Sequence, residues 1–245
     1  MAQFSDPHLT ALAVLAIAIV GSVWTARHRP GSPTRVLAVT LAGLILAAWA
    51  GEYVADAVTG TWNARSTLPL QLTDAVSLVS AVALLSRNQL AVELTYFWSL
   101  SATLQAIITP DLGQNFPSVY YFTYFGYHIG AVVAGCLLVF GCGQYPRRHA
   151  AWRVFGLTLV WAAIAGAGDV ITGGNYMYLA FRPQHNSLLG LFGPWPLYIA
   201  GGAVIGLAML LALQWLAGWA ARHDRRGRTE ARAGGAATAW PTYQP

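Results

Sequence analysis

Thr73 and His128 are the two side chains whose types are best suited to covalent chemistry. A threonine hydroxyl can attack an acyl carbonyl if an imidazole within about 2.6–3.2 Å takes its proton, and the product is an acyl-enzyme. Gln71 lies two residues before the hydroxyl and could stabilise an oxyanion. Asp74 points about 100° away from Thr73 around a helix, so it is poorly placed to orient His128.

Each of these residues also has a structural interpretation. Threonine in a membrane helix commonly donates to the carbonyl four residues back, and a lone histidine there is often a hydrogen-bonded packing residue. Asp74 is harder to explain by packing, because a buried carboxylate must be paired, protonated or solvated. Asp56, Asp169 or Asn175 could orient the imidazole in place of Asp74.

Composition places these residues in a membrane protein. Of the 245 residues, 56% are hydrophobic and 9% are charged, whereas a soluble domain carries about 25% charged residues. This composition excludes a soluble globular domain, a disordered chain and a nucleic-acid-binding protein. The 14 basic residues are all arginine, which excludes a lysine Schiff base and a Walker A phosphate loop. Two cysteines cannot form a cysteine-rich zinc site, and we expect neither a metal nor a cofactor.

Seven apolar segments are long enough to cross about 30 Å of hydrocarbon as helices. They lack the two-residue alternation of barrel strands, so the predicted fold is all-α, a polytopic membrane protein with seven transmembrane helices. The predicted segments cover residues 9–26, 35–58, 68–86, 89–109, 118–141, 151–172 and 194–219.

The arginines predict the orientation of these helices. Twelve follow the first, third, fifth and seventh segments, against two, Arg65 and Arg182, in the alternate loops. The positive-inside rule then puts the N-terminus outside and the C-terminus in the cytoplasm. We expect a multi-pass protein of the cell membrane, in contact with membrane lipids, with a transmembrane domain over residues 1–220. Residues 221–245 are predicted to form a disordered, arginine-rich cytoplasmic tail.

Polar residues gather in the predicted outer half of the bundle. Ionisable groups inside a bilayer cost several kcal/mol and usually face the bundle interior, so the sequence predicts a polar cavity that opens toward the outer leaflet. Thr73 and His128 lie on segments that both run inward, at depths about one helical turn apart, so the two groups could meet. The residues expected to support this cavity are Gln71, Asp74, Asp169 and Asn175.

Glu93 is the acidic residue expected near the cytoplasmic end. We predict a structural role for it, in which its carboxylate reaches toward Arg87 or Arg153. Cys136 and Cys142 are predicted to be packing residues, because their reducing compartment disfavours a disulfide.

Several motifs in one order resemble the YwaF-type integral membrane proteins of bacteria. The resemblance covers about residues 68–198. Its motifs are Leu68-Pro69-Leu70-Gln71-Leu72-Thr73-Asp74, Tyr96-Phe97-Trp98-Ser99-Leu100, Leu104-Gln105-Ala106, Thr109-Pro110-Asp111, Phe116-Pro117-Ser118, His128, Asn175-Tyr176-Met177-Tyr178-Leu179 and Gly193-Pro194-Trp195-Pro196.

That group is similar to a eukaryotic transmembrane acyltransferase that remodels ether phospholipids with a Cys and a His. More remotely, it is similar to intramembrane hydrolases of fatty-acid esters that use a Thr and a His. The resemblance implies that Thr73 is the nucleophile, that His128 is its base and that the substrate is an acyl lipid. Relatives often have His-x-Cys-Asp where this chain has Gln71-Leu72-Thr73-Asp74, so a hydroxyl replaces a thiol and an amide replaces an imidazole.

Three functions therefore follow from the sequence. The first is an intramembrane lipid acyltransferase or ester hydrolase. The second is a small-solute or proton-coupled transporter with Asp74 and His128 as a proton relay, although no inverted repeat is detectable. The third is a membrane scaffold without chemistry, which a dry and closely packed outer half would favour.

Overall fold

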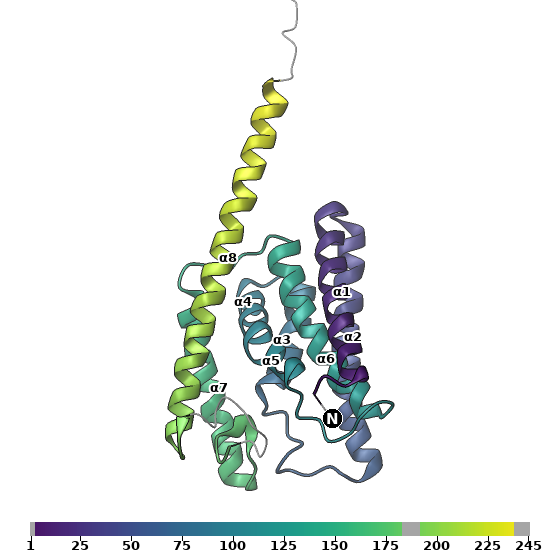
Figure 1. Ribbon diagram of the computed structural model, residues 1–245, viewed down its shortest axis with the longest axis vertical. Helices are drawn as coiled ribbons and strands as arrows, with labels where there is room; N and C mark the ends of the chain where they lie inside the picture. The colour runs from purple at the N-terminus through teal and green to yellow at the C-terminus, as the bar shows by residue number, and fades with distance from the viewer. Residues whose placement is uncertain (1–2, 183–191, 238–245) are drawn as a thin grey trace, which may run out of the picture.

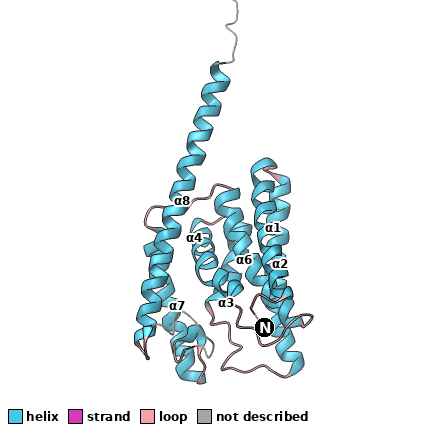
Figure 2. Ribbon diagram, viewed as in Figure 1, coloured by secondary structure: helices cyan, strands magenta, loops and turns pink. Residues whose placement is uncertain are grey.

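The structure is a computed structural model that describes residues 3–182 and 192–237, with side chains described as far as residue 225. Within these residues the chain forms helices and no strand (Figure 2). The all-α prediction is therefore correct for the described part of the chain.

Five helices are long and apolar enough to cross a membrane. Large apolar side chains cover their outer faces, and Ile17, Val20, Val58 and Val170 are all more than half exposed. Such extensive apolar exposure fits contact with lipid better than contact with water. The five are α1 (Asp6–His28), α2 (Ser32–Thr59), α6 (Val119–Cys136, continued by the π-helical η2, Leu137–Gly141), α7 (Ala150–Thr172) and α8 (Leu197–Ala237).

Two further helical segments lie where the sequence predicted a third and a fourth span. α3 (Leu72–Ser86) has 15 residues and is about 22 Å long, which is shorter than the hydrocarbon core. α4 (Gln89–Trp98), η1 (Ser99–Thr103) and α5 (Leu104–Ile108) form one helical run with a π-helical turn in its middle. Five helices in the described residues, rather than the expected seven, meet the length and apolarity of a span.

The last helix extends further than the sequence predicted. α8 continues to Ala237, whereas the transmembrane domain was expected to end at residue 220 and to be followed by a disordered tail. Alanine and arginine, which are abundant in this stretch, are both strong helix formers. Residues 221–237 are helical where the sequence predicts a disordered tail, residues 238–245 lie outside the described chain, and the domain boundary at residue 220 stays a prediction.

α6 is the central helix of the bundle (Figure 1). In its most apolar window 72% of the residues are buried, against at most 22% in the other four long helices. Glycines allow its neighbours to approach closely. A methyl group added at Gly130 would lie 2.5 Å from Ile45 of α2, and one added at Gly135 would lie 3.3 Å from the Tyr96 Cα of α4.

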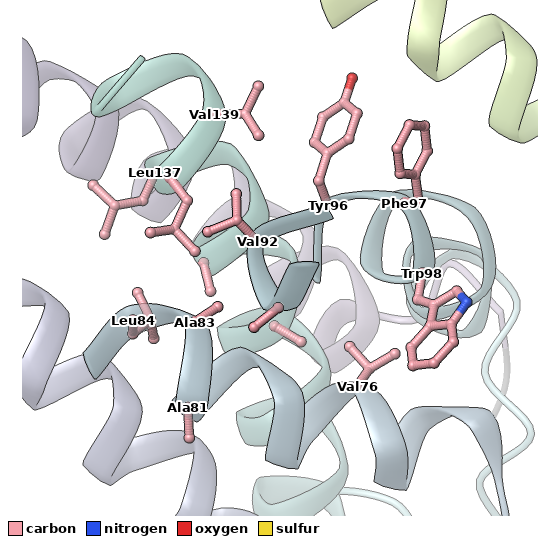
Figure 3. Packing of buried hydrophobic residues seen from close by; sticks show 14 of the residues in the cluster. Val76, Ala81, Ala83, Leu84, Val92, Tyr96, Phe97, Trp98, Leu137 and Val139 are labelled. Carbon is pink, nitrogen blue, oxygen red and sulfur yellow. The ribbon is translucent and has the colours of Figure 1, made fainter. Parts of the chain in front are cut away.

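A buried apolar cluster joins α3, α4 and η2 (Figure 3). Val76 of α3, Val92 of α4 and Leu137 of η2 are all fully buried. Tyr96 of α4 is also buried, and its hydroxyl donates to the Leu213 carbonyl of α8 over 3.0 Å. This cluster holds the two short helices against the centre of the bundle.

Glu93 has the structural role that the sequence predicted. Its side chain is fully buried and accepts hydrogen bonds from Arg147 Nε at 2.8 Å and Arg153 Nη2 at 3.2 Å. The second expected partner, Arg87, instead donates to Gln144. Because a buried carboxylate is tolerated only when it is paired, this cluster ties α4 to the start of α7. Cys136 and Cys142 are both free thiols, as expected.

A test of the close packing around α6 compares Gly135→Ala with Gly156→Ala. The new methyl group at position 135 would lie 2.6 Å from Ser99 Oγ, and such overpacking costs about 1–3 kcal/mol. Nothing lies within 4 Å of a methyl group at Gly156, so that variant gains helix propensity of up to about 1 kcal/mol. Thermal unfolding in detergent should therefore move in opposite directions. A Gly135→Ala protein as stable as the unmodified one would contradict the packing.

Candidate functional site

Thr73 lies in the first turn of α3, because this helix begins at Leu72 and not at residue 68. Gln71 precedes the helix in an extended conformation, and its N–H donates to Asp74 Oδ2 over 3.0 Å. A carboxylate at the third helical position that accepts this N–H is a common helix-start arrangement. It also places negative charge at the positive end of the helix dipole.

This late start leaves the Thr73 hydroxyl without a helical carbonyl to bind. The residue four positions earlier is Pro69, which precedes the helix. Within the described part of the chain the hydroxyl makes no hydrogen bond. The structural interpretation of Thr73, a bond to the carbonyl four residues back, is therefore wrong.

Asp74 is paired with side chains from α2. Its Oδ1 accepts from Trp49 Nε1 over 3.0 Å and from the Tyr53 hydroxyl over 2.8 Å. Together with the Gln71 N–H, these are three hydrogen bonds to one carboxylate that is 8% exposed. Asp74 thus joins α2 to the first turn of α3 and satisfies the pairing that its burial demands.

A polar pocket of about 80 Å³ opens beside this first turn. A buried water needs about 10–15 Å³ of such volume, so the pocket holds a few waters or one small polar group. Sites for whole drug-sized ligands measure about 300–1,000 Å³, so an entire lipid does not fit inside. The lining residues are Trp49, Glu52, Tyr53, Asp56, Ser66, Thr67, Leu68, Gln71, Thr73, Asp74 and Tyr127.

One face of α2 supplies four of these lining residues, Trp49, Glu52, Tyr53 and Asp56. Their spacing of three and four residues puts them on the same side of the helix. Asp56 accepts from the Tyr120 hydroxyl of α6 over 2.9 Å, and Glu52 keeps one buried carboxylate oxygen without a partner among the described residues. Sequence analysis named Asp56 as a candidate partner of the imidazole but did not identify the two aromatic residues, although the same spacing joins all four.

His128 is buried next to the pocket without lining it. Its side chain is 2% exposed, and its Nδ1 lies 2.7 Å from the Tyr124 carbonyl oxygen. Since a carbonyl only accepts, Nδ1 carries the proton and Nε2 is left as the basic nitrogen. The ring centroids of Tyr124 and Tyr127 lie 4.1 and 4.4 Å from the centroid of the imidazole. Of these three residues, Tyr127 alone lines the pocket.

Two other residues expected at the cavity have different positions. Asn175 closes its own loop, because its side chain binds the backbone of Ala180 and Phe181. Asp169 lies near the end of α7, where one oxygen accepts from the Tyr176 N–H over 2.6 Å. Its second oxygen is buried and has no partner in the part of the chain that the structure describes. Neither residue lines the pocket.

Gln71 connects the pocket to the loop that follows α7. Its side-chain oxygen accepts from the Met177 N–H over 2.9 Å, so the amide nitrogen remains as a donor. Met177 belongs to the short helix η3 (Tyr176–Tyr178). The Tyr176 hydroxyl accepts from the Leu68 N–H and donates to the Ala64 carbonyl, over 2.9 and 2.7 Å. These bonds hold the loop against the residues that lead into α3.

A further bond holds this loop to the one after α5. The Tyr178 hydroxyl donates to Asp111 Oδ2 over 2.8 Å. Burial and the Asp111 carboxylate raise the pKa of Tyr178 above its ordinary value. The phenol therefore stays protonated and keeps its donor role at physiological pH.

Comparison with known protein families identifies the family of this chain. A family model described as the TMEM164 family matches residues 3–214. The match includes Gln71, Thr73, Asp74 and His128. No curated protein and no solved structure matches the chain. Because the matched region is most of the sequence, the chain belongs to the TMEM164 family of membrane proteins.

Proposed function

We propose that this integral membrane protein is a lipid acyltransferase or ester hydrolase that uses Thr73 as its nucleophile and His128 as its base. The observation that carries the proposal is the position of the Thr73 hydroxyl. Thr73 lines a polar pocket at the first turn of α3, and its hydroxyl makes no hydrogen bond within the described residues. The resemblance of the motifs from residue 68 to residue 198 supports the same assignment.

The chemistry has two steps. Thr73 Oγ attacks the ester carbonyl of an acyl lipid, His128 Nε2 takes the hydroxyl proton, and the departing alcohol receives that proton as the acyl–threonine ester forms. Water or a second lipid alcohol then attacks this ester and gives its proton to the imidazole, which passes it to Thr73 Oγ as the ester bond breaks, so that both the hydroxyl and the neutral imidazole are restored. Water as the acceptor makes the enzyme a hydrolase, and a lipid alcohol makes it a transferase.

Donors for the oxyanion are available beside the nucleophile. The first N–H groups of a helix have no partner inside the helix, and Thr73 itself lies in that turn. The Gln71 amide nitrogen is a second donor, because the side-chain oxygen is already bound to Met177. Such fixed donors are worth about 2.7–4 kcal/mol each in other acyl-transfer enzymes.

For His128 to act as the base, the Tyr127 side chain must move. The proton transfer needs Thr73 Oγ and His128 Nε2 within about 2.6–3.2 Å. In the described structure Tyr127, and not His128, lines the pocket. Because the Tyr127 ring contacts the imidazole, a movement of this ring on substrate binding would open a path between the imidazole and the pocket. The bond from Nδ1 to Tyr124 already prepares Nε2 to accept a proton.

The alternative functions have less support. A proton relay from Asp74 to His128 would need a path between them, but the Asp74 oxygens accept from Trp49, Tyr53 and Gln71. No hydrogen bond in the described part of the chain joins the two groups. A scaffold without chemistry fits a dry interior better than a polar pocket beside a free hydroxyl.

The test of the enzyme compares Thr73→Val with Thr73→Ser. Valine keeps the shape but removes the nucleophile, so labelling by a fluorophosphonate probe and ester turnover should disappear, whereas serine should retain both. His128→Gln should lower turnover by about 10²–10⁴-fold, as expected for loss of a general base. Expression and thermal stability serve as controls. Unchanged labelling in both Thr73→Val and His128→Gln would refute the proposal, and loss of solute flux in Asp74→Asn with no labelling at Thr73 would favour transport.

We also propose that the chain crosses the cell membrane seven times with its N-terminus outside. The helical run over residues 89–108 is about 30 Å long and can span the hydrocarbon core. α3 then crosses together with residues 68–71, the bend and turn that precede it. α1 starts at the lower end of the bundle and α8 leaves at the upper end (Figure 1), which agrees with an odd number of crossings.

Cysteine labelling tests this topology in a variant that lacks the two native thiols. Trp62→Cys, in the loop after α2, should react with a membrane-impermeant maleimide on intact cells. Ser86→Cys, at the end of α3, should react only after permeabilisation, because seven crossings put this residue inside. Both side chains are exposed. Labelling of Ser86→Cys on intact cells would show that α3 does not cross.

A further inference from the structure

A second, larger recess lies at the end of α2 opposite the polar pocket. It has a volume of about 820 Å³ and is formed by the end of α1, the start of α2, the end of α3, the turn after η2 and α8. Its lining residues are Ala26, Arg27, His28, Pro30, Gly31, Thr34, Arg35, Arg87, Gly141, Cys142, Gly143, His223 and Asp224.

The lining of this recess has more positive than negative charge. It contains three arginines and one carboxylate, Asp224. Asp224 pairs with Arg27 over 3.3 Å. Arg87 donates to the neutral amide of Gln144 over 3.2 Å. Arg35 is exposed, and its side chain makes no hydrogen bond or ion pair within the described residues. Two of the three lining arginines, Arg35 and Arg87, therefore have no carboxylate partner within the described residues.

The start of α2 adds to this positive potential. Gly31 is the residue before the helix, and no side chain caps the N–H groups of the first turn. Gly31 and Thr34 both line the recess. Uncapped N–H groups and the helix dipole favour an anion at this end of a helix. The start of α2 and the two arginines therefore both favour a negatively charged ligand.

We propose that this recess binds a phosphate-bearing anion through Arg35 and Arg87. Guanidinium groups bind phosphate oxygens with two parallel hydrogen bonds. The volume of about 820 Å³ lies within the range of sites for drug-sized ligands, so a phosphate-bearing headgroup fits inside. The recess lies where α1 and α3 end and α2 starts, which is the level of the lipid headgroups in the proposed topology. An anionic lipid headgroup and a soluble phosphate share the chemistry that this site recognises.

The experiment uses the full chain in nanodiscs and has two arms. In the first arm, native mass spectrometry compares retention of phosphatidylglycerol with retention of phosphatidylcholine. In the second arm, inorganic phosphate and pyrophosphate are titrated into protein held in phosphatidylcholine nanodiscs. Binding in the first arm alone assigns the site to a lipid headgroup, and binding in the second assigns it to a soluble phosphate. Either result supports the proposal, and binding in neither arm overturns it.

Variants assign the binding to the recess. Arg35→Gln and Arg87→Gln should each weaken it about tenfold, the usual effect of losing hydrogen bonds to a charged group. Arg148→Gln is the matched control, because Arg148 is equally exposed, makes no ion pair among the described residues and does not line the recess. It should change the affinity less than twofold. An equal loss in Arg148→Gln would show diffuse attraction to surface charge and would overturn the proposal. The unfolding temperature without ligand confirms that Arg35→Gln is folded.

Discussion

The hydrogen bonds of one buried carboxylate determine where Thr73 lies. Asp74 accepts from the Gln71 N–H at the start of α3, and from Trp49 and Tyr53, which hold that start against α2. Without these bonds the burial of a charged group beside a membrane core would cost several kcal/mol. Because α3 starts at Leu72, the residue four positions before Thr73 lies outside the helix. The Thr73 hydroxyl therefore has no helical carbonyl to bind, and Thr73 lines the pocket.

The rest of the bundle supports this arrangement through close packing and a second buried carboxylate. Lipid gives no hydrophobic drive between helices, so glycines that let backbones approach and interhelical polar bonds carry much of the association. Gly130 and Gly135 of α6 serve the first purpose, and Glu93 with its two arginines serves the second. Polar groups thus fix both ends of the bundle, with an apolar cluster between them.

Sequence reasoning predicted the all-α membrane fold and placed Gln71, Thr73 and Asp74 together, because helical spacing and the cost of buried charge are local properties. It did not predict that α3 starts four residues late, which depends on side chains of α2 far away in the chain. It also could not show that Tyr127 lies at the pocket where His128 was expected. That outcome depends on the rotation of α6 about its own axis, and apolar sequence of this kind specifies it weakly.

Hydrogen exchange at the start of α3 is the most direct test of this account. Asparagine has one side-chain oxygen acceptor where aspartate has two. In Asp74→Asn, therefore, either the Gln71 N–H or the Trp49 and Tyr53 donors of α2 lose their acceptor. Losing a buried acceptor costs about 1–3 kcal/mol, and exchange of the amides over residues 71–76 should accelerate about tenfold or more. Asp56→Asn, which changes a neighbouring carboxylate bound to Tyr120, should leave these amides unchanged. Equal exchange in Asp74→Asn and the unmodified protein would contradict the account.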